Sequence, residues 1–212
     1  MPLLFPSLPS EAKAKAGPQL EVEKTLASYR ESRNFKAQVK KTITQEILGG
    51  DPSVSEGEFY FSKGRLRLEI SKPEPTILVF DGKHIWFESR IGEGKDQKIV
   101  VSKMKAQQIK KSDSLLAVLF DKKDILKSFN LKSTKSLDKG KQFVFTPKDT
   151  KKSEVQLLQL VLIPKSKEIL SISYTDSVEN KVDLEFSNTQ KTEVPKNKFS
   201  YTPPKGADVT EL

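Results

Sequence analysis

Apolar and polar residues alternate along most of this chain with a period of two, the pattern of half-buried β-strands. The clearest case is residues 35–47, where Phe35, Ala37, Val39, Ile43 and Ile47 alternate with lysine, glutamine and threonine. Further strand-like segments cover residues 57–62, 66–70, 76–80, 84–87, 99–104, 143–145, 155–163, 169–174, 181–186 and 198–201. This succession predicts about eleven antiparallel strands in an all-β sheet or barrel.

Turn residues mark where several of these strands end. Pro73 and Pro75 follow the strand at 66–70, and proline cannot donate a hydrogen bond to a neighbouring strand. Asp81-Gly82 lies between the segments at 76–80 and 84–87, and this dipeptide favours the positive φ angles of a tight hairpin turn. We therefore expect those two segments to pair.

Helical spacing replaces the alternation in a few places. Val22, Leu26 and Tyr29 are spaced as on one face of an amphipathic helix over residues 19–33, with Pro18 near its start. Residues 112–114, Ser-Asp-Ser, offer helix N-caps ahead of an apolar run at 115–120, and a short helical turn is predicted over 124–129.

A long antiparallel meander leaves two edge strands exposed, and a curled sheet whose mouth is covered by helices reduces that exposure. We therefore predict a mainly β fold, an incomplete, half-open antiparallel β-barrel whose helices form a lid over an apolar cavity. Barrels of this size can hold a small hydrophobic ligand. The alternative, in which the same apolar stripes form only a packed core, stays open from the pattern alone.

Length and cysteine content limit the classes of protein. The 212 residues suit one domain, which we place at residues 19–212 after a flexible segment at 1–18. The absence of cysteine excludes disulfides, thiolate metal sites, cysteine nucleophiles and a lipid-modified N-terminal cysteine. The chain has no run of about 18–20 apolar residues, so we expect no membrane-spanning helix, and residues 1–10 match a signal peptide poorly.

The formal net charge of +9 suggests nucleic-acid binding as one alternative. Aromatic residues at 59–61 lie near Lys63, Arg65 and Arg67, a mixture found in proteins that bind single strands. The lysines are nevertheless spread through nearly every turn instead of clustering on one element. A solvated basic surface is therefore favoured, with no nucleic-acid partner, and it also suits contact with anionic lipid head groups.

An enzyme is a further alternative. His84 is the only histidine and lies beside the predicted hairpin turn, without a GxSxG, HExxH, phosphate-loop or dinucleotide-binding motif in the chain. The sequence therefore predicts no catalytic residue, no metal site and no cofactor.

Five short motifs follow one another in an order that is characteristic of one family. They are the helix that leads into Phe35-Lys36-Ala37-Gln38-Val39, the pair Glu56-Gly57, the hairpin at 77–87 after Pro73, the strand end at 143–147, and residues 199–209, which read Phe-Ser-Tyr-Thr-Pro-Pro-Lys-Gly-Ala-Asp-Val. Together they span residues 20–209. In this order they resemble the LolA family of periplasmic lipoprotein carriers.

The resemblance implies an incomplete barrel closed by lid helices, with a cavity that receives the acyl chains of lipoproteins. It also implies a monomer in the periplasm that uses no cofactor and meets membranes only peripherally. Its partners would be acylated lipoproteins, an ATP-driven release complex in the inner membrane and a lipoprotein acceptor at the outer membrane.

The chain departs from the family pattern in one turn. The family has Arg-Pro before the strand at 66–70, and that arginine ties the lid to the barrel, whereas this chain reads Ser-Lys-Gly-Arg at 62–65. Lys63 and Arg65 are the candidates for lid contact, although lysine lacks the planar five-donor fork of arginine. Aliphatic residues also replace aromatic ones at 66–70. A binding protein for another lipid, or a lipoprotein sensor, is therefore the alternative function.

The predicted lipid-binding residues alternate along the strands that would form the cavity wall. They are Phe35, Val39, Phe59, Phe61, Leu66, Leu68, Ile70, Leu78, Phe80, Ile85 and Phe87, with Leu115, Leu116 and Leu119 lining the lid.

Overall fold

Twelve strands form one open sheet in the computed structural model, which describes residues 10–31, 34–45, 49, 51–92, 97–105, 125–151 and 153–212. The strands are β1 (Asn34–Gln45), β2 (Ser53–Ser62), β3 (Arg65–Lys72), β4 (Thr76–Phe80), β5 (His84–Ile91), β6 (Lys98–Lys105), β7 (Phe129–Leu137), β8 (Gly140–Pro147), β9 (Val155–Ile163), β10 (Glu168–Asp176), β11 (Asn180–Lys191) and β12 (Asp208–Glu211). The helices in the described ranges are α1 (Ser10–Glu31), α3 (Ile125–Ser128) and the short 3₁₀ helix η5 (Lys196–Phe199).

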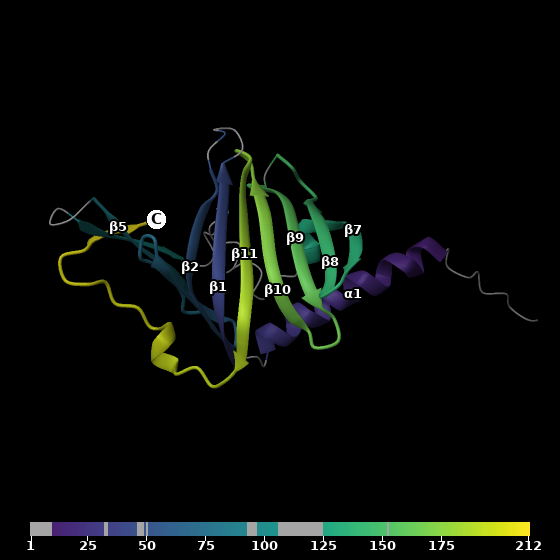
Figure 1. Cartoon of the computed structure of the whole chain (residues 1–212), viewed down its shortest axis with the longest axis horizontal. Helices are drawn as coiled ribbons and strands as arrows, with labels where there is room; N and C mark the ends of the chain where they lie inside the picture. Colours follow the sequence, from purple (N-terminus) through teal and green to yellow (C-terminus); the bar gives the residue numbers. More distant parts are fainter. Residues whose placement is uncertain are drawn as a thin grey trace, which may run out of the picture.

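The strands lie in the order β12-β6-β5-β4-β3-β2-β1-β11-β10-β9-β8-β7, and the two end strands do not pair with each other. All neighbours are antiparallel except β12 and β6, which are parallel. β1 pairs with β2 on one side and with β11 on the other, which joins the first and second halves of the chain at the middle of the sheet (Figure 1). The predicted mainly β, incomplete barrel is therefore confirmed as an open, mostly antiparallel sheet.

The predicted hairpin between 76–80 and 84–87 is confirmed. β4 pairs with β5, and Gly82 in the connecting turn has a φ of 97°, which glycine adopts without steric cost. The Asp81 carboxylate accepts hydrogen bonds from the backbone N–H groups of Lys83 and His84, each at 2.7 Å. The aspartate therefore stabilises the turn that its position indicates.

Two features of the strand pattern differ from the prediction. β7 was not predicted. It is an edge strand that pairs only with β8 and is exposed over most of its length. Its sequence therefore lacks the alternation of apolar and polar residues that identifies a half-buried strand. The strand predicted at 198–201 is wrong: residues up to Phe199 form η5, and the last strand is β12. Pro195, Pro203 and Pro204 flank that segment, and none of them can donate a ladder hydrogen bond.

The first helix also differs from its prediction. α1 begins at Ser10, and Pro18 lies inside it instead of near its start. Alternating alanines precede Gly17, and alanine has the highest helix propensity of all residues, which favours the longer helix. Among the described residues, no helix is long and apolar enough to cross a membrane.

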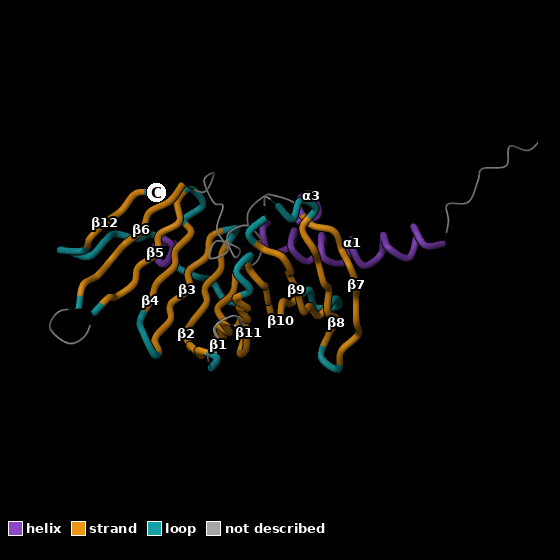
Figure 2. The backbone as a smooth tube through the Cα atoms, turned by 90° about the horizontal axis from the view of Figure 1, so that it is seen from above, coloured by secondary structure: helices purple, strands orange, loops and turns teal. Residues whose placement is uncertain are grey.

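α1 lies against one face of the sheet, on the side of β8–β10 (Figure 2). Val22, Leu26 and Tyr29 are at most 1 % exposed and belong to the main apolar cluster, as their spacing predicts. The Tyr29 hydroxyl accepts a hydrogen bond from the backbone N–H of Ile169 on β10 at 3.0 Å, and Lys141 on β8 forms an ion pair with Glu21 at 2.7 Å. The helix is thereby attached to β8 and β10, and its last turn lies over the aromatic residues of β1 and β2.

Candidate functional site

The apolar face under α1 is built from rows of residues that run across the strands. In the first row, Phe61, Leu66, Phe80 and Ile85 are successive register partners on β2–β5 and are at most 4 % exposed. Tyr29 packs on the Phe61 end of this row, with its ring centroid 5.8 Å from that of Phe61. The row nearest the helix is therefore a closed core.

The next rows lead away from α1. Phe59, Leu68, Leu78 and Phe87 are register partners in the second row, and exposure rises from 0 % at Phe59 to 39 % at Phe87. In the third row, Gly57, Ile70 and Thr76 are aligned. Because Phe87 at the end of the second row is exposed, this end of the face offers apolar surface to a hydrophobic ligand.

A cavity of about 280 Å³ lies at this end of the face, near the lower limit of about 300 Å³ for ligand pockets. It joins side chains from β1, β3, β4, β5, β10 and β11. Its lining residues are Lys41, Ile43, Leu68, Ile70, Thr76, Leu78, Phe87, Tyr174, Val182 and Leu184. Most of them are apolar, so the cavity is suited to a hydrocarbon chain.

The structure brings only part of the predicted wall to this cavity. Leu68, Ile70, Leu78 and Phe87 line it, and the first three also belong to the main apolar cluster, whereas the others belong to that cluster without lining the cavity. Those packed residues are Phe35, Val39, Phe59, Phe61, Leu66, Phe80 and Ile85. The predicted helix at 112–120 and its lid residues Leu115, Leu116 and Leu119 lie outside the described residues.

Sequence reasoning missed the contribution of the second half of the chain. Tyr174, Val182 and Leu184 come from β10 and β11, which meet β1 only through long-range pairing. Lys41 and Ile43 lie two residues apart on β1, so both point to the same face as Val39. The period of two therefore placed Lys41 on the apolar face, although its charge made it look like a surface residue.

The candidates for lid contact lie elsewhere. Lys63 is in the turn between β2 and β3 with a φ of 48°, and Arg65 begins β3. Both line a polar groove of about 660 Å³ beside η5, together with Glu193 and Lys196. Their contact with the lid stays a prediction, because the predicted lid is outside the described residues.

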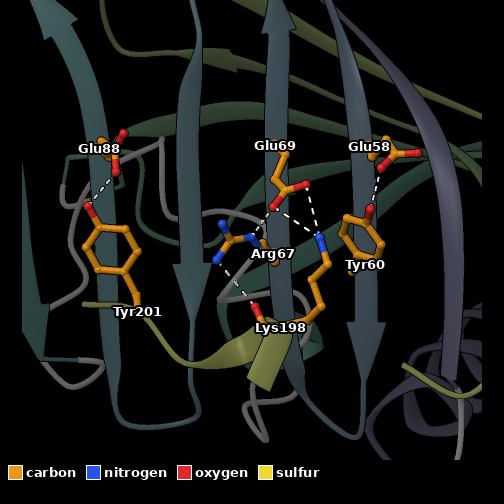
Figure 3. Close-up of polar contacts among 7 residues, drawn as sticks. All are labelled: Glu58, Tyr60, Arg67, Glu69, Glu88, Lys198 and Tyr201. Atoms are coloured by element: carbon orange, nitrogen blue, oxygen red, sulfur yellow. Dashed lines mark hydrogen bonds and ion pairs between the residues drawn. The ribbon is translucent and has the colours of Figure 1, made fainter. Parts of the chain in front are cut away.

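The opposite face of the sheet carries a polar cluster that holds residues 192–212, here called the C-terminal segment. Arg67 on β3 binds Glu69 at 2.5 Å and donates a hydrogen bond to the backbone carbonyl of Lys198 at 3.4 Å (Figure 3). The Lys198 ammonium lies 3.4 Å from Glu69 and 4.3 Å from the centroid of the Tyr60 ring. These contacts tie η5 to the strands that carry the cavity wall on their other face.

Tyr201 is the second anchor of the C-terminal segment. Its hydroxyl donates a hydrogen bond of 2.6 Å to Glu88 on β5, and Glu88 is only 7 % exposed (Figure 3). Burial, followed by the hydrogen bond and the negative charge of Glu88, raises the pKa of the Tyr201 phenol. Val79 and Val101 are fully buried on this face, outside the main apolar cluster, so the segment covers a small second core.

We expect Tyr201→Phe to lower the free energy of unfolding by about 1–3 kcal/mol, because it leaves the buried Glu88 carboxylate without this donor. Phenylalanine keeps the ring contact with Trp86, whose centroid is 5.4 Å away. Urea denaturation at pH 7 measures the loss. Tyr60→Phe is the matched control and should cost less, because its acceptor Glu58 is 40 % exposed.

The same variant has an expected pH dependence. The pKa of Tyr201 is raised in the folded protein. Its contribution to the free energy of unfolding is therefore complete at pH values below the pKa of about 10 in the unfolded chain. The contribution is lost as the pH rises through the pKa in the folded protein. The stability difference between the wild type and Tyr201→Phe should stay constant from about pH 7 to 9 and shrink above about pH 10. A difference that grows with alkaline pH would contradict the assignment.

The described ranges also bear on the predictions about metal ions and His84. No group of three or more His, Asp or Glu side chains is placed there to hold a metal ion. His84 lies 3.6 Å from Asp81 in the β4–β5 turn, away from the residues that line the cavity. The site is best described as an apolar cavity with one cationic side chain.

Comparisons with known proteins fit this geometry. Residues 34–202 match the family model described as "Outer membrane lipoprotein carrier protein LolA". A protein of Dechloromonas aromatica named outer-membrane lipoprotein carrier protein is 30 % identical, over 97 % of this chain and 92 % of its own length. A protein of the same name from Chromobacterium violaceum is 27 % identical, over 95 % of this chain and 90 % of its own length.

Among solved structures, an uncharacterized conserved protein from Thermus thermophilus is similar, with a TM-score of 0.52. It is 17 % identical, and the match covers 93 % of this chain and 99 % of that one. At this identity the likeness concerns the fold alone, an open β-sheet that spans nearly the whole chain.

Proposed function

This chain belongs to the LolA family of outer membrane lipoprotein carrier proteins, and we propose from this premise that it is a periplasmic carrier of lipoproteins. It binds the acyl chains of a lipoprotein in the cavity between β3–β5 and β10–β11 and moves the lipoprotein from the inner to the outer membrane. The carrier itself breaks no covalent bond.

The apolar cavity is the observation that carries the proposal. Leu68, Ile70 and Leu78 are 7–8 % exposed, and Phe87 is 39 % exposed at the cavity. Removal of an acyl chain from water gains about 0.8 kcal/mol per buried methylene. Contact with an apolar wall of this kind therefore favours binding of a lipid chain.

Release and delivery of the cargo need partners on both membranes. We propose that the chain receives acylated lipoproteins from an ATP-driven release complex at the inner membrane and gives them to an acceptor at the outer membrane. It acts as a monomer, contacts membranes only peripherally and binds no nucleic acid. Its net charge of +9 favours brief contact with anionic lipid surfaces.

Native mass spectrometry tests the carrier function. The protein is incubated with a detergent-solubilised triacylated lipoprotein, or with the same lipoprotein without its acyl chains. We expect a one-to-one complex with the acylated form only. Equal binding of both forms, or no complex with a folded sample, would contradict the proposal, and binding of a free lipid alone would favour the other-lipid alternative.

A further inference from the structure

We propose that one end of the sheet is a docking surface for anionic lipid bilayers. This surface, here called the basic end, comprises the β2–β3 turn, the β9–β10 turn and the chain that follows β11, with the strand residues next to them. In residue numbers it is 62–65, 163–168 and 191–196. The inference rests on the proposed function and locates the membrane contact of the carrier.

Antiparallel pairing gathers these segments, although they are far apart in the sequence. At the start of β1, Asn34 pairs with Ser62 of β2. The next residue of β1 pairs with Lys191 at the end of β11, and the β9–β10 turn lies at the same end because β10 and β11 are antiparallel. Figure 1 shows the end of β11 and the β9–β10 turn at the lower edge of the sheet, opposite the β1–β2 and β10–β11 turns. Lysines that the sequence spreads over several turns therefore meet on one surface.

The basic end carries an excess of positive charge. Its cationic side chains are Lys63, Arg65, Lys165, Lys167, Lys191 and Lys196, against the anionic Glu168 and Glu193. At the opposite end, the β1–β2 turn, the β10–β11 turn and the end of β3 contribute the described charged residues Lys72, Asp51, Asp176 and Glu179. The two ends therefore differ in the sign of their net charge, and an anionic surface attracts the basic end.

A polar groove lies within the basic end and offers a place for lipid head groups. Its volume is about 660 Å³, and its charged lining residues are Lys63, Arg65, Lys196 and Glu193. Three cations and one anion give the groove a positive charge, which favours binding of the phosphate of a phospholipid. The basic end therefore combines a broad attraction to anionic surfaces with a local site for a phosphate group.

Two features favour a bilayer over an acidic protein as the partner. None of the large apolar side chains that are exposed among the described residues belongs to the basic end, whereas a protein interface usually has an apolar centre. All cations of the basic end except Arg65 are lysines. The compact charge of lysine on a flexible stem suits loose contact with many head groups more than paired hydrogen bonds to one carboxylate.

Docking at the basic end keeps the cavity away from the bilayer. Ile43 lines the cavity near the far end of β1, about 30 Å from Asn34 at about 3.3 Å per residue. An acyl chain bound in the cavity is therefore not in contact with the membrane that the basic end touches. Binding of a membrane and binding of an acyl chain should thus be independent of each other.

Co-sedimentation with lipid vesicles tests this surface. The full chain is incubated at low salt with vesicles of phosphatidylcholine alone or of phosphatidylcholine mixed with phosphatidylglycerol. We expect binding to the mixed vesicles only, and loss of binding as the salt concentration rises. Soluble glycerol phosphate, which presents the same phosphate group outside a bilayer, should compete only weakly.

Two double variants with the same net charge assign the contact to one end. Lys165→Gln/Lys167→Gln removes two cations from the turn after β9 and should weaken binding to the mixed vesicles about tenfold. Lys148→Gln/Lys151→Gln changes the connection before β9, at the opposite end of that strand, and should bind the vesicles as the wild type does. Both variants should bind a triacylated lipoprotein normally in native mass spectrometry, which shows that fold and cavity are intact.

Each other outcome overturns a defined part of the argument. Equal loss of vesicle binding in both variants would overturn the basic end, because the net charge alone would then explain the attraction. Equal binding to neutral vesicles, or release from mixed vesicles by the triacylated lipoprotein, would overturn it too, because contact would then run through the cavity. Strong competition by glycerol phosphate would overturn the assignment to a bilayer.

Failure of this inference is distinguishable from failure of the proposed function. Binding of the triacylated lipoprotein without binding of any vesicle would overturn the docking surface alone and would favour an acidic protein as its partner. Binding of the mixed vesicles without binding of the lipoprotein would overturn the carrier function, while the docking surface would stand.

Discussion

Leu68→Glu is expected to weaken binding of a triacylated lipoprotein by about thirtyfold or more. Leu68 lines the cavity in the second row, between Phe59 and Leu78. A carboxylate at this place must be removed from water or must hold water in the cavity when an acyl chain enters. A cost of about 2 kcal/mol corresponds to this factor in affinity. Native mass spectrometry or fluorescence titration measures the change.

Two control variants separate the cavity from general effects of a new charge. Leu68→Met keeps an apolar side chain of similar volume and should bind nearly as well as the wild type. Ser71→Glu introduces the same charge near the exposed end of β3 and should not alter binding. Circular dichroism should show that all three variants are folded. Full affinity of a folded Leu68→Glu variant would show that acyl chains bind elsewhere.

Gly57→Ala is expected to lower the free energy of unfolding by about 3 kcal/mol or more. A Cβ atom at Gly57 would lie 2.0 Å from the backbone oxygen of Glu69 and 2.8 Å from the Cα atom of Ile70. Backbone atoms cannot rotate away, so β2 and β3 would have to separate beside the cavity wall. The register between these strands already shifts between Glu56 and Gly57. Urea denaturation of purified protein measures the loss.

Gly17→Ala is the matched control for this substitution. A Cβ atom at Gly17 meets no heavy atom within 4 Å, and the residue lies inside α1. Alanine there should change the free energy of unfolding by no more than about 1 kcal/mol, because its higher helix propensity is opposed by the close approach of its Cβ atom to the ring of Pro18. A Gly57→Ala variant within about 1 kcal/mol of the wild type would show that the two strands are farther apart.

The sequence predicted strands well where one face is buried and poorly where none is. β3 shows the predicted alternation, with Leu66, Leu68 and Ile70 buried and their neighbours facing out. β7 and β12 are edge strands with mostly exposed residues, so no hydrophobic pattern identifies them. The start of α1 was misplaced because Pro18 was interpreted as a boundary, although the tertiary contacts of Val22 and Tyr29 hold the helix in place downstream of it.

The position of the cavity was less predictable than its apolar character. The alternation correctly put Phe35, Phe59 and Phe61 on the same face as Leu68. It could not show that Tyr29 of α1 packs on Phe61, because the direction of a helix over a sheet depends on tertiary contacts such as that of Tyr29 with Ile169. Predicted wall residues therefore divide between core and cavity.

The sequence by itself determined the strand faces, the hairpin at Asp81-Gly82 and the family, because each depends on neighbouring residues or on short motifs in a fixed order. Only the tertiary structure decided which residues meet at the cavity. Lys41 and Leu184 become neighbours when β1 pairs with β11, and no local pattern encodes a contact between residues so distant in the chain. That pairing places a lysine in a mostly apolar wall, because side chains from both strands line the same cavity.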